Sequence, residues 1–295
     1  MNPTLFFLLT KRLSACYETN EARAIARLLL SDGLLWSETA VYTRTEAEIS
    51  LIEQTQLEDY VHRLLNEHEP VQYVLGKAFF MGHTFAVQRG ALIPRPETAE
   101  LVRLILRDLQ VAQRPKDDVV KKEMRILDIG TGSGCIAISL ALACPIATVE
   151  AWDISPDALQ IAERNAANLE AKVQFKECDA LKLPVLPEEY AVIVSNPPYI
   201  LPDEQVDMRI EVLEHEPHSA LFVPAEDPLC FVRVLSTLGQ AALISTGKLY
   251  LEINPLLAEE TAAVLVADGY KDVEILQDEL GRQRFAKASK GEVTQ

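Results

Sequence analysis

Hydrophobic residues recur at helical spacing over the first 70 positions of the chain. Residues 21–30 are almost all strong helix formers, and Leu5, Leu8 and Leu9 indicate the apolar face of a preceding helix. The pattern continues to Pro70 through Ala47, Leu51, Tyr60, Val61, Leu64 and Leu65. No residues in this stretch form a pattern typical of catalysis. We therefore predict a helical N-terminal domain over 1–70 that docks a partner.

The pattern changes after residue 70. Alternating apolar positions, aromatic residues and glycines from Val71 to Gly90 predict one or two short β-hairpins, in a linker over 71–95. The sequence IPRPET (93–98) follows, and a proline in the first turn beside an acid is typical of a helix start. It is predicted to cap a helix from Thr98 to about Val111. A rigid elbow that forms a pocket wall is the alternative, which local evidence favours less.

From Met124 onward, short buried strands alternate with helical segments. Strands are predicted over 124–129, 147–152, 173–178, 190–195, 248–254, 273–276 and 284–286, with helices after several of them. Such alternation is typical of an α/β fold with a doubly wound, mostly parallel sheet. We assign residues 96–288 to this domain and residues 289–295 to a disordered tail.

Composition narrows the class of protein. The 295 residues carry 44 acidic and 28 basic side chains, a net charge of −16. This balance, without a dense basic run, argues against long nucleic acid as the partner. The five cysteines are scattered without a C-x-x-C pair, and His215 and His218 lack an obvious third ligand, so we expect neither disulfides nor a metal site. The apolar run 5–9 is too short to span a membrane, so we expect a cytoplasmic protein.

Three strand ends carry residues suited to a nucleoside-containing ligand. Gly130, Gly132 and Gly134 do not match G-x-G-x-x-G, but they would let the backbone approach a ligand at a helix N-terminus. Asp153 ends the next strand at the offset where doubly wound folds bind a ribose diol. Asp179 closes the third strand, where it could accept a hydrogen bond from an adenine amino group. An ordinary glycine turn and strand-end acids are the alternative at each position taken singly.

The fourth strand runs directly into Asn196-Pro197-Pro198-Tyr199. Two prolines remove consecutive backbone donors and stiffen the chain, which makes a rigid elbow at the tip of the strand. An amide side chain can hold a planar amino group, and a phenol ring can stack on it. The motif therefore predicts a pocket for a flat, nitrogen-bearing substrate.

These motifs together resemble the class I S-adenosylmethionine-dependent methyltransferases, and within them the peptide-chain-release-factor glutamine N5-methyltransferases. The class is indicated by DIGTGSG (128–134), Asp153, Asp179 and NPPY (196–199). The narrower family is indicated by PVQYVLG (70–76), FMG (80–82), IPRPET (93–98), EHEPHSAL (214–221) and DELGRQRF (278–285). The resemblance runs from about Pro70 to Phe285 and implies a seven-stranded sheet.

The resemblance also implies roles for particular residues. The methionine part of S-adenosylmethionine would lie against Gly130, Thr131, Gly132, Ser133 and Gly134. Asp153 would hold the ribose, and Asp179 with the backbone of Ala180 would contact the adenine. Asn196 would lie next to both cofactor and substrate: Asn196 and Pro197 would accept hydrogen bonds from the substrate amide, with Pro198 and Tyr199 completing the pocket. The substrate would be the glutamine of the Gly-Gly-Gln motif in release factors, and we expect a monomeric enzyme. This chain departs from the family pattern at Ala99, Ala180 and Pro255.

An amide nitrogen is a poor nucleophile, and no base is placed by sequence to deprotonate it. The hypothesis is that Asn196 and the Pro197 carbonyl align the nitrogen with the methyl group, so that orientation supplies much of the catalysis. A methyltransferase of adenine or guanine amino groups is the alternative enzyme, against which the acidic balance argues. A non-catalytic nucleotide-binding module is a second alternative, and the complete NPPY motif argues against it. A nicotinamide oxidoreductase ranks last, because the glycine spacing of this sequence does not match the dinucleotide-binding motif G-x-G-x-x-G.

Overall fold

The computed structural model describes residues 3–112, 124–185, 187 and 189–291. The chain divides into two compact units: Met1–Lys77 with Arg209–His215, and Ala78–Met208 with Glu216–Gln295. Each unit has its own hydrophobic core.

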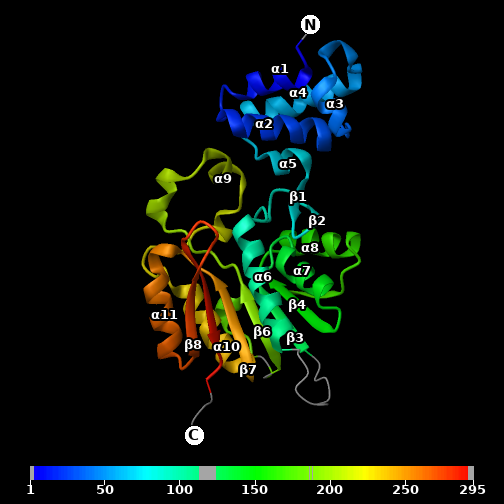
Figure 1. Ribbon diagram of the computed structural model, residues 1–295. Helices are drawn as coiled ribbons and strands as arrows, with labels where there is room; N and C mark the ends of the chain where they lie inside the picture. Colours follow the sequence, from blue (N-terminus) through cyan, green and yellow to red (C-terminus); the bar gives the residue numbers. More distant parts are fainter. Residues whose placement is uncertain (1–2, 113–123, 186, 188, 292–295) are drawn as a thin grey trace. The chain divides into compact units, whose positions relative to one another are not determined.

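The first unit is helical, as predicted for residues 1–70. Its helices, coloured blue to cyan in Figure 1 except for the last, are α1 (Leu5–Leu13), α2 (Thr19–Leu28), η1 (Leu29–Gly33), α3 (Glu38–Thr43), η2 (Glu46–Glu48), α4 (Leu51–Leu65), α5 (Val71–Leu75) and α9 (Ile210–His215). The apolar faces meet in one core, in which Leu13, Leu29 and Leu30 are fully buried. Helix α4 begins with a capping box, in which Ser50 and Glu53 bond to each other's backbone N–H.

Helix α5 corrects the prediction of hairpin structure from residue 71. Five residues are too few for the helical period to show in the sequence. The helix is held instead by distant contacts: the guanidinium of Arg63 donates to the carbonyls of Tyr73 and Val74, at 3.3 and 3.2 Å. Gly76 then ends it with φ +69°, a left-handed conformation that glycine adopts without strain. The hairpin follows as β1 (Lys77–Phe80) and β2 (His83–Ala86).

The second unit is the predicted α/β fold. After β2 its elements are α6 (Pro96–Ala112), β3 (Met124–Ile129), α7 (Cys135–Ala143), β4 (Ala147–Asp153), α8 (Pro156–Asn168), β5 (Val173–Glu177), η3 (Ala180–Lys182), β6 (Tyr190–Ser195), η4 (Pro202–Asp207), η5 (His218–Ala220), α10 (Cys230–Ala242), β7 (Leu243–Glu252), η6 (Pro255–Leu257), α11 (Ala258–Ala267), β8 (Lys271–Gln277) and β9 (Gln283–Ser289).

The sheet has seven strands in the order β5-β4-β3-β6-β7-β9-β8 (Figure 1). The first five in this order run parallel, and β9 runs antiparallel to both β7 and β8. The chain moves outward from β3 to β5 and then returns to place β6 on the other side of β3. The order therefore reverses between β3 and β6, where ligands of doubly wound sheets bind. At the far end, Ser289 is the last residue of β9 and pairs with Lys248 of β7, so the prediction of a disordered tail from residue 289 is wrong at that residue. Residues 292–295 of the predicted tail lie outside the described residues.

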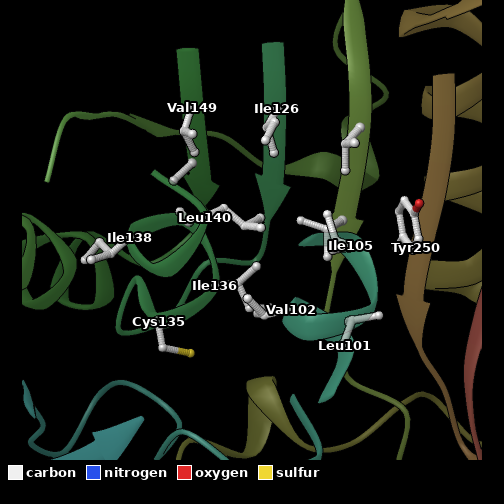
Figure 2. Packing of buried hydrophobic residues seen from close by; sticks show 14 of the residues in the cluster. Leu101, Val102, Ile105, Ile126, Cys135, Ile136, Ile138, Leu140, Val149 and Tyr250 are labelled. Carbon is white, nitrogen blue, oxygen red and sulfur yellow. The ribbon is translucent and has the colours of Figure 1, made fainter. Parts of the chain in front are cut away.

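Side chains of the buried strands alternate between two cores, one on each face of the sheet. On β3, Ile126 packs in one core and Leu127 in the other, and on β7 Tyr250 and Leu251 are divided in the same way. Figure 2 shows the first core, in which Ile126 of β3 and Val149 of β4 point towards Leu140 of α7, with residues of α6 beside them. The second core contains side chains of α10 and α11. Helices thus cover both faces, so the strand ends are the edge open to ligands.

Candidate active site

Strand register brings the predicted motifs to one edge of the sheet. Ile129, the last residue of β3, pairs with Trp152 on β4 and with Ser195 on β6. The residues that follow each of them, Gly130, Asp153 and Asn196, therefore lie level with one another at this edge. The Ser195 hydroxyl donates to the Ile129 carbonyl at 2.6 Å, which ties the ends of β6 and β3 together.

The three glycines of the turn after β3 have left-handed φ values but different surroundings. A Cβ at Gly130 (φ +74°) or Gly132 (φ +56°) would meet no heavy atom within 4 Å. A Cβ at Gly134 (φ +81°) would lie 2.8 Å from Cδ1 of Ile138 and 3.1 Å from Cβ of Ala162. Gly134 thus lets α7 pack closely on α8, whereas the first two glycines border open space in which a ligand could contact the backbone.

Asp153 holds this turn in place. One carboxylate oxygen accepts a hydrogen bond from the Gly132 N–H at 2.8 Å, and the other accepts from the Ser155 N–H at 2.9 Å. Ser155 in turn caps α8, whose first residue is Pro156. Each carboxylate oxygen can accept a further hydrogen bond, so the half-buried side chain retains capacity for a ligand hydroxyl.

Asp128, at the end of β3, is a buried acid to which the sequence analysis gave no separate role. Its Oδ2 accepts from the Thr131 hydroxyl at 2.7 Å and from the Ala137 N–H at 3.2 Å. Its Oδ1 is buried without a partner among the described residues. Burial, with repulsion from Asp153 as a lesser cause, raises the pKa of Asp128 to about 7. A buried acceptor without a donor fits a cationic or donor group of a ligand.

Asp179 and Ala180 follow β5 at the same edge. The Asp179 carboxylate accepts from the Leu181 N–H at 3.0 Å and lies 3.4 Å from Nζ of Lys182, so it caps the short helix η3. Ile154, which follows Asp153, is 60% exposed, and Leu181, which follows Ala180, is 47% exposed. Exposed apolar groups beside two strand-end acids are suited to the flat face of a base.

The NPPY segment (196–199) joins a buried chain of hydrogen bonds. The Asn196 Nδ2 donates to the Thr98 hydroxyl at 3.1 Å, and that hydroxyl donates to Oε2 of Glu252 at 2.8 Å. The Tyr199 hydroxyl donates to Oε1 of the same carboxylate at 2.8 Å. Asn254 donates to the Tyr199 carbonyl at 3.0 Å, which fixes the elbow from the end of β7.

Glu252 and Arg284 surround the Tyr199 side chain. The Glu252 side chain is 1% exposed, and burial raises its pKa above the usual value. Burial, followed by the nearby Glu252 charge, also raises the pKa of Tyr199, which therefore keeps its proton. The Arg284 guanidinium lies 5.7 Å from the ring centroid of Tyr199 and 3.4 Å from its hydroxyl. The tyrosine is thus fixed at its hydroxyl, while its side chain is still partly exposed.

The IPRPET segment (93–98) begins a helix, as predicted, and its last residue contacts the NPPY elbow. Helix α6 begins at Pro96, two residues earlier than predicted, with Glu97 in its first turn. Arg95 pairs at 2.5 Å with the carboxylate of Glu216, whose side chain is 1% exposed. The segment is therefore braced from both sides. It also brings the Thr98 hydroxyl to the Asn196 amide at the elbow.

The sequence analysis missed Thr98, Glu252, Asn254 and Arg284 as individual site residues. All four lie in stretches singled out by pattern or resemblance, but nothing in the sequence showed that they meet. No cluster of three or more His, Cys, Asp or Glu side chains that could hold a metal occurs in the described part of the chain. No helix there is both long and apolar enough to cross a membrane.

The chain is similar in sequence and in fold to known proteins. Residues 103–218 match the model of the methyltransferase small domain, and residues 8–76 match that of the PrmC N-terminal domain. The chain also resembles the solved 16S rRNA N2 G1207 methyltransferase of Thermus thermophilus in complex with AdoMet and guanosine. The TM-score is 0.50 at 16% identity, over 72% of this chain and 49% of that one, which supports the fold.

Two relatives are similar over most of their length. The release factor glutamine methyltransferase of Bacteroides thetaiotaomicron is 41% identical over 94% of this chain and 96% of its own. That of Flavobacterium psychrophilum is 42% identical over 76% of this chain and 77% of its own. Identity of this degree over such coverage extends through both the helical unit and the α/β unit. The chain therefore belongs to the release factor glutamine methyltransferase family.

Proposed function

We propose that this protein transfers a methyl group from S-adenosylmethionine to the side-chain amide nitrogen of the glutamine in the Gly-Gly-Gln motif of peptide chain release factors. The observation that carries the proposal is the register of β3, β4 and β6. It places the glycine turn, Asp153 and the NPPY motif (196–199) at one edge of the sheet. A methyl donor and a planar amide could therefore meet there.

The residues at this edge fit S-adenosylmethionine. The open space at Gly130 and Gly132 leaves room for its methionine part along residues 130–134, with Thr131, Ser133 and Gly134 completing the turn. The orphaned Oδ1 of Asp128 would accept from its amino group, and Asp153 from its ribose hydroxyls. Asp179 and the Ala180 backbone would contact the adenine, whose face Ile154 would cover. When bound, the cofactor supplies a methyl group on a positively charged sulfur.

The substrate amide would be held by the rigid elbow. The Oδ1 of Asn196 and the Pro197 carbonyl would accept the two N–H groups of the glutamine side chain, while Pro198 and the Tyr199 ring pack against its plane. Held in this way, the nitrogen would take the methyl group that the bound cofactor supplies, and the electron pair of the broken bond would leave with the donor sulfur. The nitrogen then loses one proton to water. The nearby Glu252 accepts one hydrogen bond at each oxygen, from Thr98 and from Tyr199, which suits it to holding these side chains in place. Positioning is therefore the role that we assign to these residues.

The test is to incubate the purified protein with S-adenosylmethionine and a release factor, then map any added mass by peptide sequencing. We expect one methyl group on the glutamine of Gly-Gly-Gln. A release factor with that glutamine changed to alanine should gain none. Methylation of structured RNA or DNA in a parallel reaction, with an unmodified release factor, would overturn the proposal.

The helical unit is proposed to dock the release factor. It carries exposed apolar side chains, among them Phe7, Leu51 and Ile52 at 59%, 78% and 80% exposure. Apolar side chains exposed to solvent can be covered by a protein partner. We further propose that the enzyme acts in the cytoplasm, because release factors act in translation. We also propose that it is a monomer.

The raised pKa of Asp128 predicts pH-dependent cofactor affinity. An amino group of the cofactor would pair with the ionised carboxylate, and this form is depleted below its pKa of about 7. We expect the affinity for S-adenosylmethionine to fall about tenfold between pH 8 and pH 6, measured by titration calorimetry. Asp128→Asn should weaken binding and abolish this dependence. An equally steep dependence in that variant would contradict the assignment.

The same shift has a consequence for stability in the absence of cofactor. Because the pKa of Asp128 is about 7 in the folded protein and 3.8 in its ordinary state, the folded chain binds this proton more tightly. The contribution of Asp128 to the free energy of unfolding is therefore full below pH 4 and is lost as the pH rises through 7. Bound cofactor should reduce the loss.

A further inference from the structure

We propose that Thr98 and Glu252 are positioning residues that set which way the Asn196 amide faces during methyl transfer. The inference rests on the proposed function, since it concerns the group that would hold the substrate amide. It adds two residues, from helix α6 and strand β7, that need not touch the substrate themselves.

The directions of two hydrogen bonds fix the orientation of the Asn196 amide. A threonine hydroxyl has one hydrogen, and that of Thr98 is donated to Glu252 at 2.8 Å. Its oxygen can then only accept from Asn196, so the group that faces it at 3.1 Å must be the Nδ2 amide. The Oδ1 of Asn196 is thereby turned away from Thr98. This leaves the acceptor for the N–H group of the substrate.

The oxygen and nitrogen of an amide are nearly equal in size, so shape alone would not choose between the two orientations of the Asn196 amide. The hydrogen bonds to Thr98 and Glu252 make the choice. An amide turned by half a rotation would present two hydrogens to the substrate nitrogen, which also carries hydrogens, and the pair would repel. Only one of the two orientations is therefore productive. The ionised carboxylate of Glu252 can only accept a hydrogen bond, so Thr98 must donate to it and must accept from Asn196.

The position of Glu252 follows from the sheet. Leu251 of β7 pairs with Ser195 of β6, so the residues that follow them, Glu252 and Asn196, lie at the same level. Glu252 is still held in the sheet, where it pairs with Phe285 of β9. Thr98 reaches both from the first turn of α6, where its side chain is 2% exposed. Elements this well packed hold side chains more precisely than a loop does, which suits a positioning role.

The charge state of Glu252 should control the orientation. The groups that act on it are Thr98 and Glu97 from α6, Tyr199 from the elbow and Arg284 from β9. Arg284 favours the ionised form, whereas burial and Glu97 favour the neutral form. A protonated Glu252 could donate to the Thr98 oxygen. The Thr98 hydrogen would then turn to Asn196 and draw Oδ1 inward, away from the substrate.

Two substitutions of nearly equal size test the hydroxyl. Thr98→Val keeps the shape and removes the hydroxyl, whereas Thr98→Ser keeps the hydroxyl. We expect the valine variant to lower the single-turnover methylation rate on the order of ten- to a hundredfold, with cofactor affinity unchanged, and serine to restore most of the rate. Thr261→Val, which alters a buried threonine of α11, is the matched control for truncation.

A double-mutant cycle separates positioning from a structural role. If Thr98 acts through Asn196, Thr98→Val should have little further effect in an Asn196→Ala background. A structural role would lower the rate by the same factor in both backgrounds. Equal factors, or a valine variant as fast as the Thr261→Val control, would overturn the inference.

The rate against pH tests Glu252. In the parent enzyme the rate at saturating cofactor should fall on the acid side as Glu252 takes up a proton, and Glu252→Gln should remove this fall while lowering the plateau. An unchanged acid limb in that variant would count against Glu252. Failure of the proposed function would look different: the parent enzyme itself would leave the release factor glutamine unmethylated.

Discussion

Asn196→Ala should lower kcat for release factor methylation by roughly a hundred- to a thousandfold. The substitution removes the side chain that would accept a hydrogen bond from the substrate amide, and with it the means of aligning the nitrogen with the methyl group. The affinity for S-adenosylmethionine should change only a few-fold, because the glycine turn and Asp153 lie on other strands. Quenched-flow methylation and calorimetry measure the two effects separately.

Asn168→Ala, an exposed asparagine at the end of α8, is the matched control and should leave both quantities unchanged. Thermal unfolding would show whether the Asn196 variant keeps its fold, since Asn196 also bonds to Thr98. If the folded variant bound cofactor and turned over at close to the parent rate, orientation by Asn196 could not be the source of catalysis.

The features that could be predicted from sequence are those carried by contiguous residues. The glycine turn and the NPPY elbow each combine a strand with residues that cannot continue it, so both their location and their geometry follow from local chemistry. The convergence of Asp153 with them also followed, because parallel strands end at one edge. The sequence pattern could not show which residues of neighbouring strands lie side by side. The strand register in the structure supplies this information.

What the sequence did not predict depends on contacts between distant residues. Thr98 and Glu252 are 154 positions apart, and no local pattern distinguishes a threonine in a first helical turn from one that bonds to a buried carboxylate. In the sequence, Asp128 was only the first residue of the motif DIGTGSG. That its Oδ1 is buried without a partner among the described residues can be seen only in the structure. Helix α5 was missed for a related reason, since the guanidinium of Arg63 holds it from outside the segment.

Gly132 and Gly134 belong to the same turn, and the sequence did not show which of them serves packing and which serves ligand binding. Their surroundings in the structure distinguish the two roles. Gly134 is the first residue before α7, and a Cβ there would lie 2.8 Å from Ile138 and 3.1 Å from Ala162. At Gly132 a Cβ would meet nothing within 4 Å. Both have positive φ, so each substitution by alanine includes the cost of left-handed backbone, and only one adds a clash.

Gly134→Ala should therefore lower the free energy of unfolding by about 2–5 kcal/mol, the sum of backbone strain and overpacking between α7 and α8. Gly132→Ala should lower it by only about 1–2 kcal/mol, but its methyl group would occupy the space proposed for the cofactor. Denaturant unfolding with and without S-adenosylhomocysteine separates the two. The ligand should stabilise the parent and, to a similar extent, the Gly134 variant that remains folded, while the Gly132 variant should gain little. If both variants lost stability equally and bound the ligand equally, the distinction between a packing glycine and a binding glycine would be wrong.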